Sequence, residues 1–291
     1  MIISPSHRFV YVGIPRTASK SMNEWLMRHH GGIWYGGHHD YRPIPDGARS
    51  FLVFTTVRNP YDRAVSGYFG RHWGDRPRRT EDRVTVEPPT PAVMADLIER
   101  GRNEEEKFGS YRDFIEGAGV MLLLHYERLP ECLLELPFAD PATVRGFPHV
   151  LERGIRPAGR FEDFFDDRYE AYVWDTCRDD FRVGGYQRHD SGLPEKSPSC
   201  KWLEKEVPGH KLQVPGGVTT TLWEMAGQSR PLDESQMRIC RDLFAAQART
   251  HPVAGARERF LQASRRERFD RHFVRDHAAF AMERAGDGGS G

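Results

Sequence analysis

Two stretches of the chain decide its fold: FVYVGIPRTASKS at residues 9–21 and FLVFTTVRNPYDRAVS at residues 51–66. Each begins as a short apolar run, typical of a buried strand, and turns polar, cationic and hydroxyl-bearing where a helix is expected to begin. The start of a helix presents unpaired backbone N–H groups and the positive end of the helix dipole, and an Arg or Lys adds a full charge. The pair therefore predicts an α/β fold with two anion-binding turns, suited to a ligand with two phosphate-like ends.

The first turn differs from the phosphate loop of nucleotide hydrolases, which requires G-x-x-x-x-G-K-[ST]. Counted from Gly13, the second glycine position falls on Ala18, and Ser19 intrudes before the Lys-Ser pair. Such hydrolases also end a later apolar strand in an acidic residue that holds magnesium, whereas the second apolar run here ends in Arg58. A nucleotide kinase or hydrolase is therefore the less favoured alternative.

The second turn contains the signals of a helix start. Asn59 is a good N-cap, Pro60 suits the first helical position, and Asp62 places a carboxylate where it complements the helix dipole. Ser66 lies two turns into that helix. Its hydroxyl can contact the same phosphate as Arg58 only if the end of the strand folds over the helix. The alternative for Ser66 is a small residue at a helix packing face.

Together the two turns resemble the sulfotransferases that use 3′-phosphoadenosine-5′-phosphosulfate (PAPS). In that family a P-K-T-[AG]-[ST]-type loop binds the 5′-phosphosulfate and an R-[ND]-P-x-x-R-x-x-S segment binds the 3′-phosphate. PRTASKS at residues 15–21 is similar to the first motif and RNPYDRAVS at residues 58–66 to the second. The resemblance implies a P-loop-like three-layer α/β fold with a central parallel sheet, PAPS as donor, adenosine 3′,5′-bisphosphate as product, and no metal.

The resemblance also implies which residues contact the nucleotide. They are the first loop and two residues of the second motif: Pro15, Arg16, Thr17, Ala18, Ser19, Lys20, Ser21, Arg58 and Ser66. The loop lysine of the family is replaced here by Arg16, and a lysine stands at Lys20 instead. Arginine keeps the charge and adds a planar fork, but it is not an interchangeable donor. Either Arg16 or Lys20 could stabilise the leaving group.

A pair of histidines lies between the two turns, in GGIWYGGHHDYR at residues 31–42. Sulfuryl transfer to an alcohol needs a base near neutral pH, and imidazole has a suitable pKa. The segment resembles the Y-x-G-H region of the heparan-sulfate 2-O-sulfotransferases, whose catalytic histidine falls on His38. His39 is the alternative base, and one of the two could orient the acceptor. A polar loop with two exposed histidines would also fit this pattern, and a metal site fits it more weakly.

Composition limits the partners. The chain has 291 residues with 42 basic and 42 acidic side chains, so no overall field favours nucleic acid or a membrane surface. The four cysteines, Cys132, Cys177, Cys200 and Cys240, form no C-x-x-C pair, which favours reduced thiols. No apolar run is long enough to span a bilayer. We expect a cytoplasmic, bacterial enzyme that acts on a hydroxyl of a carbohydrate or small metabolite, with its oligomeric state open. A non-catalytic binder of anionic polymers is the alternative from another class.

The chain divides into four expected parts. They are a sulfotransferase core at 1–190, an irregular connection at 191–230, a helical C-terminal extension at 231–284 and a disordered tail at 285–291. Helices are expected at 19–30, 91–99, 111–116, 169–180, 233–249 and 255–284, and a buried parallel strand at 120–126. The irregular stretch at 71–91 is either a lid over the acceptor or a solvated loop. YERL at 126–129 and DDFRVGGY at 179–186 resemble later motifs of the family.

Overall fold

The structure, a computed structural model, describes residues 1–36, 43–71, 110–148, 167–188, 200–203, 206–207, 210–211, 232–250 and 254–265. Its centre is a six-stranded sheet in the order β3-β1-β2-β4-β5-β6. The strands are β1 (Ile2–Ser4), β2 (Phe9–Val12), β3 (Ile33–Trp34), β4 (Leu52–Val57), β5 (Leu122–His125) and β6 (Cys200–Trp202). A second, two-stranded sheet pairs β7 (Glu206–Val207) with β8 (His210–Lys211).

The middle of the main sheet is parallel and its flanks are antiparallel. β2 pairs with β4 and β4 with β5 in parallel, whereas β1 runs antiparallel to β2 and β3, and β6 runs antiparallel to β5. The α/β class and the parallel centre are thus confirmed. Val12 pairs with Thr55, so the chain leaves β2 and β4 at the same edge of the sheet. Ligands of open α/β sheets bind at this edge, beyond the carboxyl ends of the strands.

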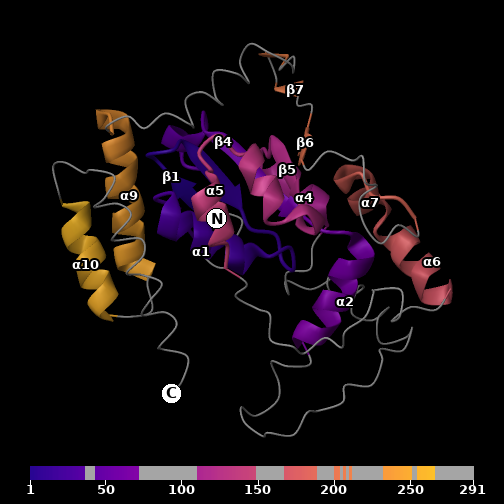
Figure 1. The fold of residues 1–291 in the computed structure, drawn as a ribbon. Helices are drawn as coiled ribbons and strands as arrows, with labels where there is room; N and C mark the ends of the chain where they lie inside the picture. The colour runs from indigo at the N-terminus through magenta and orange to yellow at the C-terminus, as the bar shows by residue number, and fades with distance from the viewer. Residues whose placement is uncertain are drawn as a thin grey trace, which may run out of the picture.

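The described helices flank this sheet. They are α1 (Ser19–His29), α2 (Pro60–Arg71), α4 (Tyr111–Ala118), α5 (Pro141–Arg145), α6 (Asp167–Thr176), α7 (Arg178–Gly184), α9 (Glu234–Thr250) and α10 (Ala254–Ser264), with short 3-10 turns η1 (Asp46–Ala48), η2 (Tyr126–Arg128) and η3 (Glu131–Glu135). Figure 1 shows α9 and α10 on one side of the sheet and α2, α6 and α7 on the other. None of these described helices is long and apolar enough to cross a membrane.

Several expected elements have different bounds in the structure. The helix expected at 169–180 is two helices, because the backbone leaves the helical conformation at Cys177 (φ −104°, ψ 20°). The helix expected at 255–284 is described only as α10, and the one expected at 91–99 lies outside the described residues. Residues 200–202, inside the segment expected to be irregular, form the edge strand β6.

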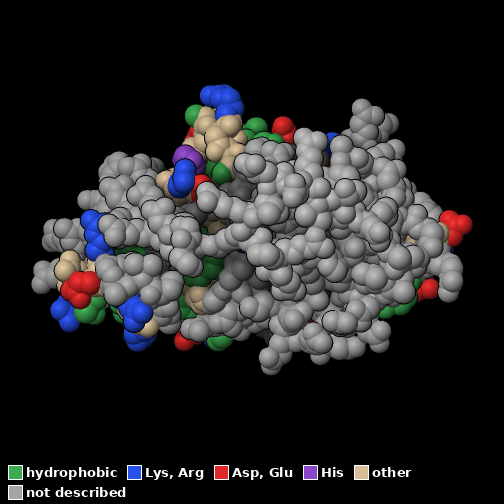
Figure 2. Space-filling view, turned by 90° about the horizontal axis from the view of Figure 1, so that it is seen from below, with side chains coloured by type: hydrophobic (Ala, Val, Ile, Leu, Met, Phe, Trp, Pro, Cys, Tyr) green, Lys and Arg blue, Asp and Glu red, His purple; other side chains and the backbone are tan. Residues whose placement is uncertain are grey.

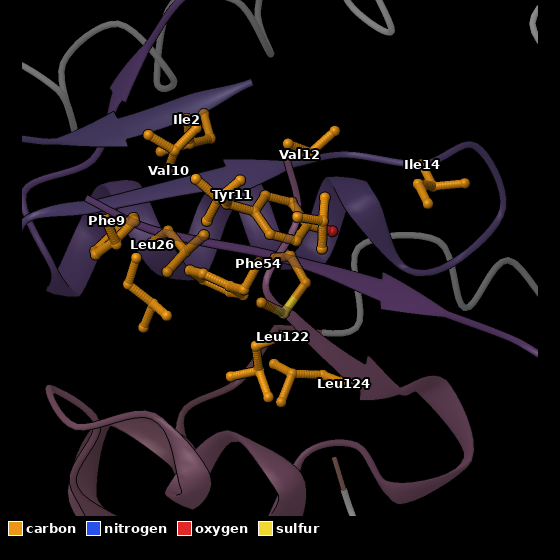
Figure 3. Packing of buried hydrophobic residues seen from close by; sticks show 14 of the residues in the cluster. Ile2, Phe9, Val10, Tyr11, Val12, Ile14, Leu26, Phe54, Leu122 and Leu124 are labelled. Atoms are coloured by element: carbon orange, nitrogen blue, oxygen red, sulfur yellow. The ribbon is translucent and has the colours of Figure 1, made fainter. Parts of the chain in front are cut away.

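The core lies where the central strands meet α1 and the segment after η3. All residues of β1, β2, β4 and β5 are buried, as expected for strands covered on both faces. The Phe9 ring stacks on that of Phe138 at 4.5 Å and meets Phe54 edge-on at 5.6 Å. Figure 3 shows Phe9, Phe54 and Leu122 within this cluster. The four cysteines are free thiols.

The C-terminal helices close the β3 side of the sheet. The side-chain amide of Gln236 on α9 donates to the Pro5 carbonyl at 2.6 Å, and Arg8 pairs with Asp233 at 3.3 Å. Phe244 of α9 stacks on Phe260 of α10. The surface carries side chains of both signs, as the described part of the face in Figure 2 shows. The helix α9 itself packs against β3 and the turn η1.

Candidate active site

The first turn, residues 13–18, leaves β2 with an unusual backbone. Arg16 and Ala18 have φ of 68° and 65°, in the left-handed region. This conformation costs a residue with a Cβ about 1–2 kcal/mol, and such strain concentrates at functional sites. Ala18 is also the N-cap of α1, and its side chain cannot cap the helix. The position at which a hydrolase loop has glycine therefore takes the conformation that glycine favours.

A network of buried hydroxyl groups fixes this turn on β4. The Thr56 hydroxyl donates to the Thr17 carbonyl at 2.8 Å and lies 2.8 Å from the hydroxyl of Tyr11. The Thr17 hydroxyl donates to the Ile14 carbonyl at 2.9 Å. Burial raises the pKa of Tyr11 well above its usual value, so its hydroxyl stays protonated. Thr17 therefore uses its side chain to hold the loop.

The first turn of α1 contains a lysine and no acidic residue of its own. Lys20 is exposed there, Arg16 is partly exposed just before it, and no acidic residue lies in that turn. A cation at the positive end of a helix dipole is unfavourable on its own. Arg28 and His29, in contrast, lie in the last turn, where the dipole favours cations. The arrangement at the start of α1 favours binding of an anion.

The second turn satisfies its own helix start. The Asn59 side chain accepts the Tyr61 N–H at 3.0 Å, which confirms the expected N-cap. The Glu127 carboxylate accepts the Asn59 N–H at 2.7 Å and the Tyr186 hydroxyl at 2.8 Å. The expectation of unpaired N–H groups at this turn is therefore wrong for Asn59 and Tyr61. The Glu127 carboxylate accepts the first N–H and the Asn59 side chain accepts the second, where an anion was expected to bind. Burial raises the pKa of Glu127, although its hydrogen bonds oppose the shift.

Arg58 joins the two turns. Its Nε donates to Asp62 at 2.5 Å and its Nη1 to the Arg16 carbonyl at 3.3 Å, while its guanidinium lies 4.0 Å from the centre of the Tyr126 ring. Burial, the largest single influence, would lower the pKa of Arg58, but Asp62, Tyr126 and Glu127 together outweigh it and the pKa is raised. Its Nη2 donates to no group in the described part of the chain. Arg58 is thus a charged clamp between the turns with one nitrogen left for a ligand.

The remaining predicted site residues are placed unevenly. Pro15, Ser19 and Ser21 are buried in the first loop and the start of α1. Ser66 is partly buried two turns along α2, and no hydrogen bond joins it to Arg58 in the described structure. His38 and His39 lie outside the described residues.

The sequence interpretation missed the roles of four side chains behind the turns, of which three are buried and Glu127 is partly buried. The Tyr111 hydroxyl accepts the Arg58 N–H at 3.0 Å and donates to the Arg58 carbonyl. Arg63 pairs with Asp180 at 3.3 Å, and Glu127 binds the N-cap of α2. Arg63 and Glu127 stand inside motifs that signal them, RNPYDRAVS and YERL. Asp180 likewise stands inside DDFRVGGY, whereas Tyr111 has no such signal, because its partners are distant in the sequence.

Comparison with known proteins places these turns in a family. A sequence model of the sulfotransferase family matches residues 1–137. The match covers 137 of the 291 residues, and we call these residues the sulfotransferase region. No curated protein and no solved structure matches the chain significantly.

The sulfotransferase region contains both turns and every strand of the main sheet except β6. Asp180, which pairs with Arg63, and Tyr186, which donates to Glu127, lie beyond it. The match supports sulfuryl transfer as the general activity and implies a sulfate donor and a hydroxyl-bearing acceptor. No group of three or more His, Cys, Asp or Glu that could hold a metal ion is present in the described ranges.

Proposed function

We propose that this chain transfers a sulfuryl group from PAPS to a hydroxyl of a carbohydrate or small metabolite. One observation carries the proposal. The two turns of the sulfotransferase region lie beside each other, with Arg58 Nη1 3.3 Å from the Arg16 carbonyl. A ligand with two anionic ends can therefore contact the side chains of both turns at once.

The first turn suits the 5′ end of the donor. Its left-handed residues alternate with Thr17, a backbone pattern that turns successive N–H groups toward an anion. Lys20 and Arg16 add charge where the departing 5′-phosphate oxygen becomes more negative. Which of the two cations does more for the leaving group is decided by comparing kcat for Arg16→Ala and Lys20→Ala.

The second turn suits the 3′-phosphate through side chains rather than backbone. The N–H groups of Asn59 and Tyr61 are already bound, so Arg58 supplies the contact through Nη2, with Ser66 as the proposed second donor. Asp62 and Tyr126 hold the guanidinium in place. A guanidinium fixed in this way directs the N–H groups of Nη2 at one place, where a phosphate oxygen can accept them.

The proton of the acceptor hydroxyl is assigned to a histidine. We propose His38 as the base, with His39 as the alternative, on their place between the turns and the resemblance to the heparan-sulfate 2-O-sulfotransferases. PAPS supplies an activated sulfuryl group, and the residues of this chain bind it and remove the proton. Loss of a positioned base costs about 10²–10⁴ in rate. His38→Ala should therefore lose turnover and keep nucleotide affinity; retained turnover would transfer the role to His39.

Calorimetric titration tests the donor assignment. The wild type should bind adenosine 3′,5′-bisphosphate, and Arg58→Lys should weaken that binding more than it weakens adenosine 5′-phosphate, because only the first has a 3′-phosphate. Lys20→Ala should weaken both nucleotides by about 10- to 100-fold, the value of one charge-assisted hydrogen bond. Arg28→Ala, an exposed cation at the other end of α1, is the matched control. Absence of binding by the wild type, or an equal effect of Arg58→Lys on both nucleotides, would overturn the proposal.

A further inference from the structure

A buried ion pair lies behind the first turn. Arg63 of α2 and Asp180 of α7 are each 2% exposed, and Arg63 Nη1 lies 3.3 Å from Asp180 Oδ2. Arg63 Nε also donates to the Pro15 carbonyl at 3.2 Å. The guanidinium lies 4.6 Å from the centre of the Tyr111 ring. The pair is therefore connected both to the loop and to α4.

Tyr111 connects the same pair to the second turn. Asp180 Oδ1 accepts the Tyr111 N–H at 2.8 Å, and the Tyr111 hydroxyl bonds both the N–H and the carbonyl of Arg58. Arg58 in turn donates to the Arg16 carbonyl. Arg63 thus holds the Pro15 carbonyl and Arg58 holds the Arg16 carbonyl. Asp180 contacts Arg63 directly and Arg58 through Tyr111, so it orders both contacts.

Holding these carbonyls sets the direction of the neighbouring N–H groups. In a trans peptide the C=O and the following N–H point in opposite directions. The Pro15 and Arg16 carbonyls point toward the arginines, so the N–H groups of Arg16 and Thr17 point away from them. These are the N–H groups of the turn assigned to the 5′ end of the donor. Their direction thus depends on a contact made from behind the loop.

We infer that Arg63 and Asp180 form a positioning pair that aims the N–H groups of the first turn at the anionic 5′ end of the donor. The inference rests on the proposed function for the identity of that anion. Neither residue touches the ligand. Asp180 lies beyond residues 1–137, so a residue outside the sulfotransferase match completes the loop.

The cost of burying charge supports a geometric role. Two charges taken out of water lose hydration, and an apolar pair of similar volume often replaces a buried ion pair without loss of stability. A fold that needed only stability could use such a pair. A guanidinium, in contrast, can bind a carboxylate and a backbone carbonyl at once in fixed directions.

The test separates loop geometry from stability. Arg63→Met combined with Asp180→Asn removes both charges and the bond to Pro15, while the asparagine oxygen can still accept the Tyr111 N–H. The matched control is Arg182→Met with Asp179→Asn, the same exchange in an exposed pair of α7 with side chains 74% and 50% exposed. Hydrogen exchange of the amides of residues 13–18 is measured without ligand, and adenosine 5′-phosphate binding is measured by calorimetry.

The double variant should exchange the Arg16 and Thr17 amides at least tenfold faster and bind adenosine 5′-phosphate about tenfold more weakly. The control should match the wild type in both. A folded double variant with unchanged exchange and affinity would overturn the inference. If the wild type binds no adenosine nucleotide, the proposed function fails, and the exchange measurement still decides whether the pair orders the loop. Arg63→Lys keeps the charge but not the fork, so it should show the same defect if direction matters.

Discussion

The two strand-to-helix turns of this chain have similar sequences and different chemistry. In the second turn, Asn59 caps α2 and Glu127 binds its first N–H, so the helix start is satisfied within the protein. In the first turn, α1 begins at Ala18 without a side-chain cap, and its first turn contains Lys20 and no acidic residue. The second turn is therefore satisfied by groups of the protein itself, whereas the first turn is suited to bind an anion. Arg58 and Arg63, at the second turn and in the helix after it, also donate to carbonyls of the first turn.

The largest expected effect is a loss of stability when the buried pair of Arg63 and Asp180 is broken. Arg63→Met leaves Asp180 buried without its counter-charge, so the free energy of unfolding should fall by about 3–5 kcal/mol. Urea denaturation measures it. Arg182→Met breaks an exposed pair in α7 and should stay within about 0.5 kcal/mol of the wild type. Equal effects of the two substitutions would show that the buried pair contributes no more than a surface pair.

The cap of the second turn should have an intermediate effect. Asn59→Ala removes the acceptor of the Tyr61 N–H and should cost about 1 kcal/mol, within the usual range of about 0.5–2 kcal/mol for an N-cap. Thermal and urea unfolding measure the loss. An unchanged stability would mean that water replaces the cap and that the second turn is as open as the first.

The corresponding change in the first turn should act in the opposite direction. Ala18→Gly removes the strain of a left-handed residue at φ 65°, which should stabilise the folded state by about 1–2 kcal/mol. Glycine also raises the entropy of the unfolded state, which opposes this gain by about 0.5–1 kcal/mol. The net result is a gain of up to about 1 kcal/mol in urea denaturation. Ala248→Gly, within helix α9, is the control and should lose about 1 kcal/mol. A loss at both positions would contradict a strained first turn.

The smallest effect concerns pH. Burial raises the pKa of Glu127 in the folded protein above its ordinary value of 4.5, so the folded state holds this proton to higher pH than the unfolded state does. This carboxyl therefore makes stability fall as pH rises from about 4.5 through the raised folded pKa. Glu127→Gln lacks this loss, so its stability relative to the wild type should increase as pH rises from about 4.5 through the raised pKa of Glu127. Parallel pH profiles from urea denaturation would show that Glu127 is not desolvated at the start of α2.

Local sequence signals predicted much of this structure. The helices at α1 and α4, the cap at Asn59 and the parallel strands β4 and β5 all follow from patterns a few residues long. The strand β6 was missed because three residues acquire their conformation only by pairing with β5, which is distant in the sequence. The pair of Arg63 with Asp180, 117 residues apart, was missed for the same reason.

Other parts of the sequence interpretation stay predictions. The base at His38 or His39, the lid at 71–91 and the stripe of Phe269, Phe273 and Phe280 lie outside the described residues. The four-part division of the chain and the cytoplasmic, bacterial setting also stay predictions.

The position of β6 in the sheet has a consequence for synthesis on the ribosome. The sulfotransferase region ends at residue 137, but the outer edge of β5 is covered only once residues 200–202 have emerged. At about 5–20 residues per second, translation needs roughly 3 to 13 seconds to add that strand. During this interval the nascent chain has an open strand edge that can pair with other chains. Asp180 also emerges late, so Arg63 is not neutralised until most of that delay has passed. The main sheet is therefore complete only after β6 has been made.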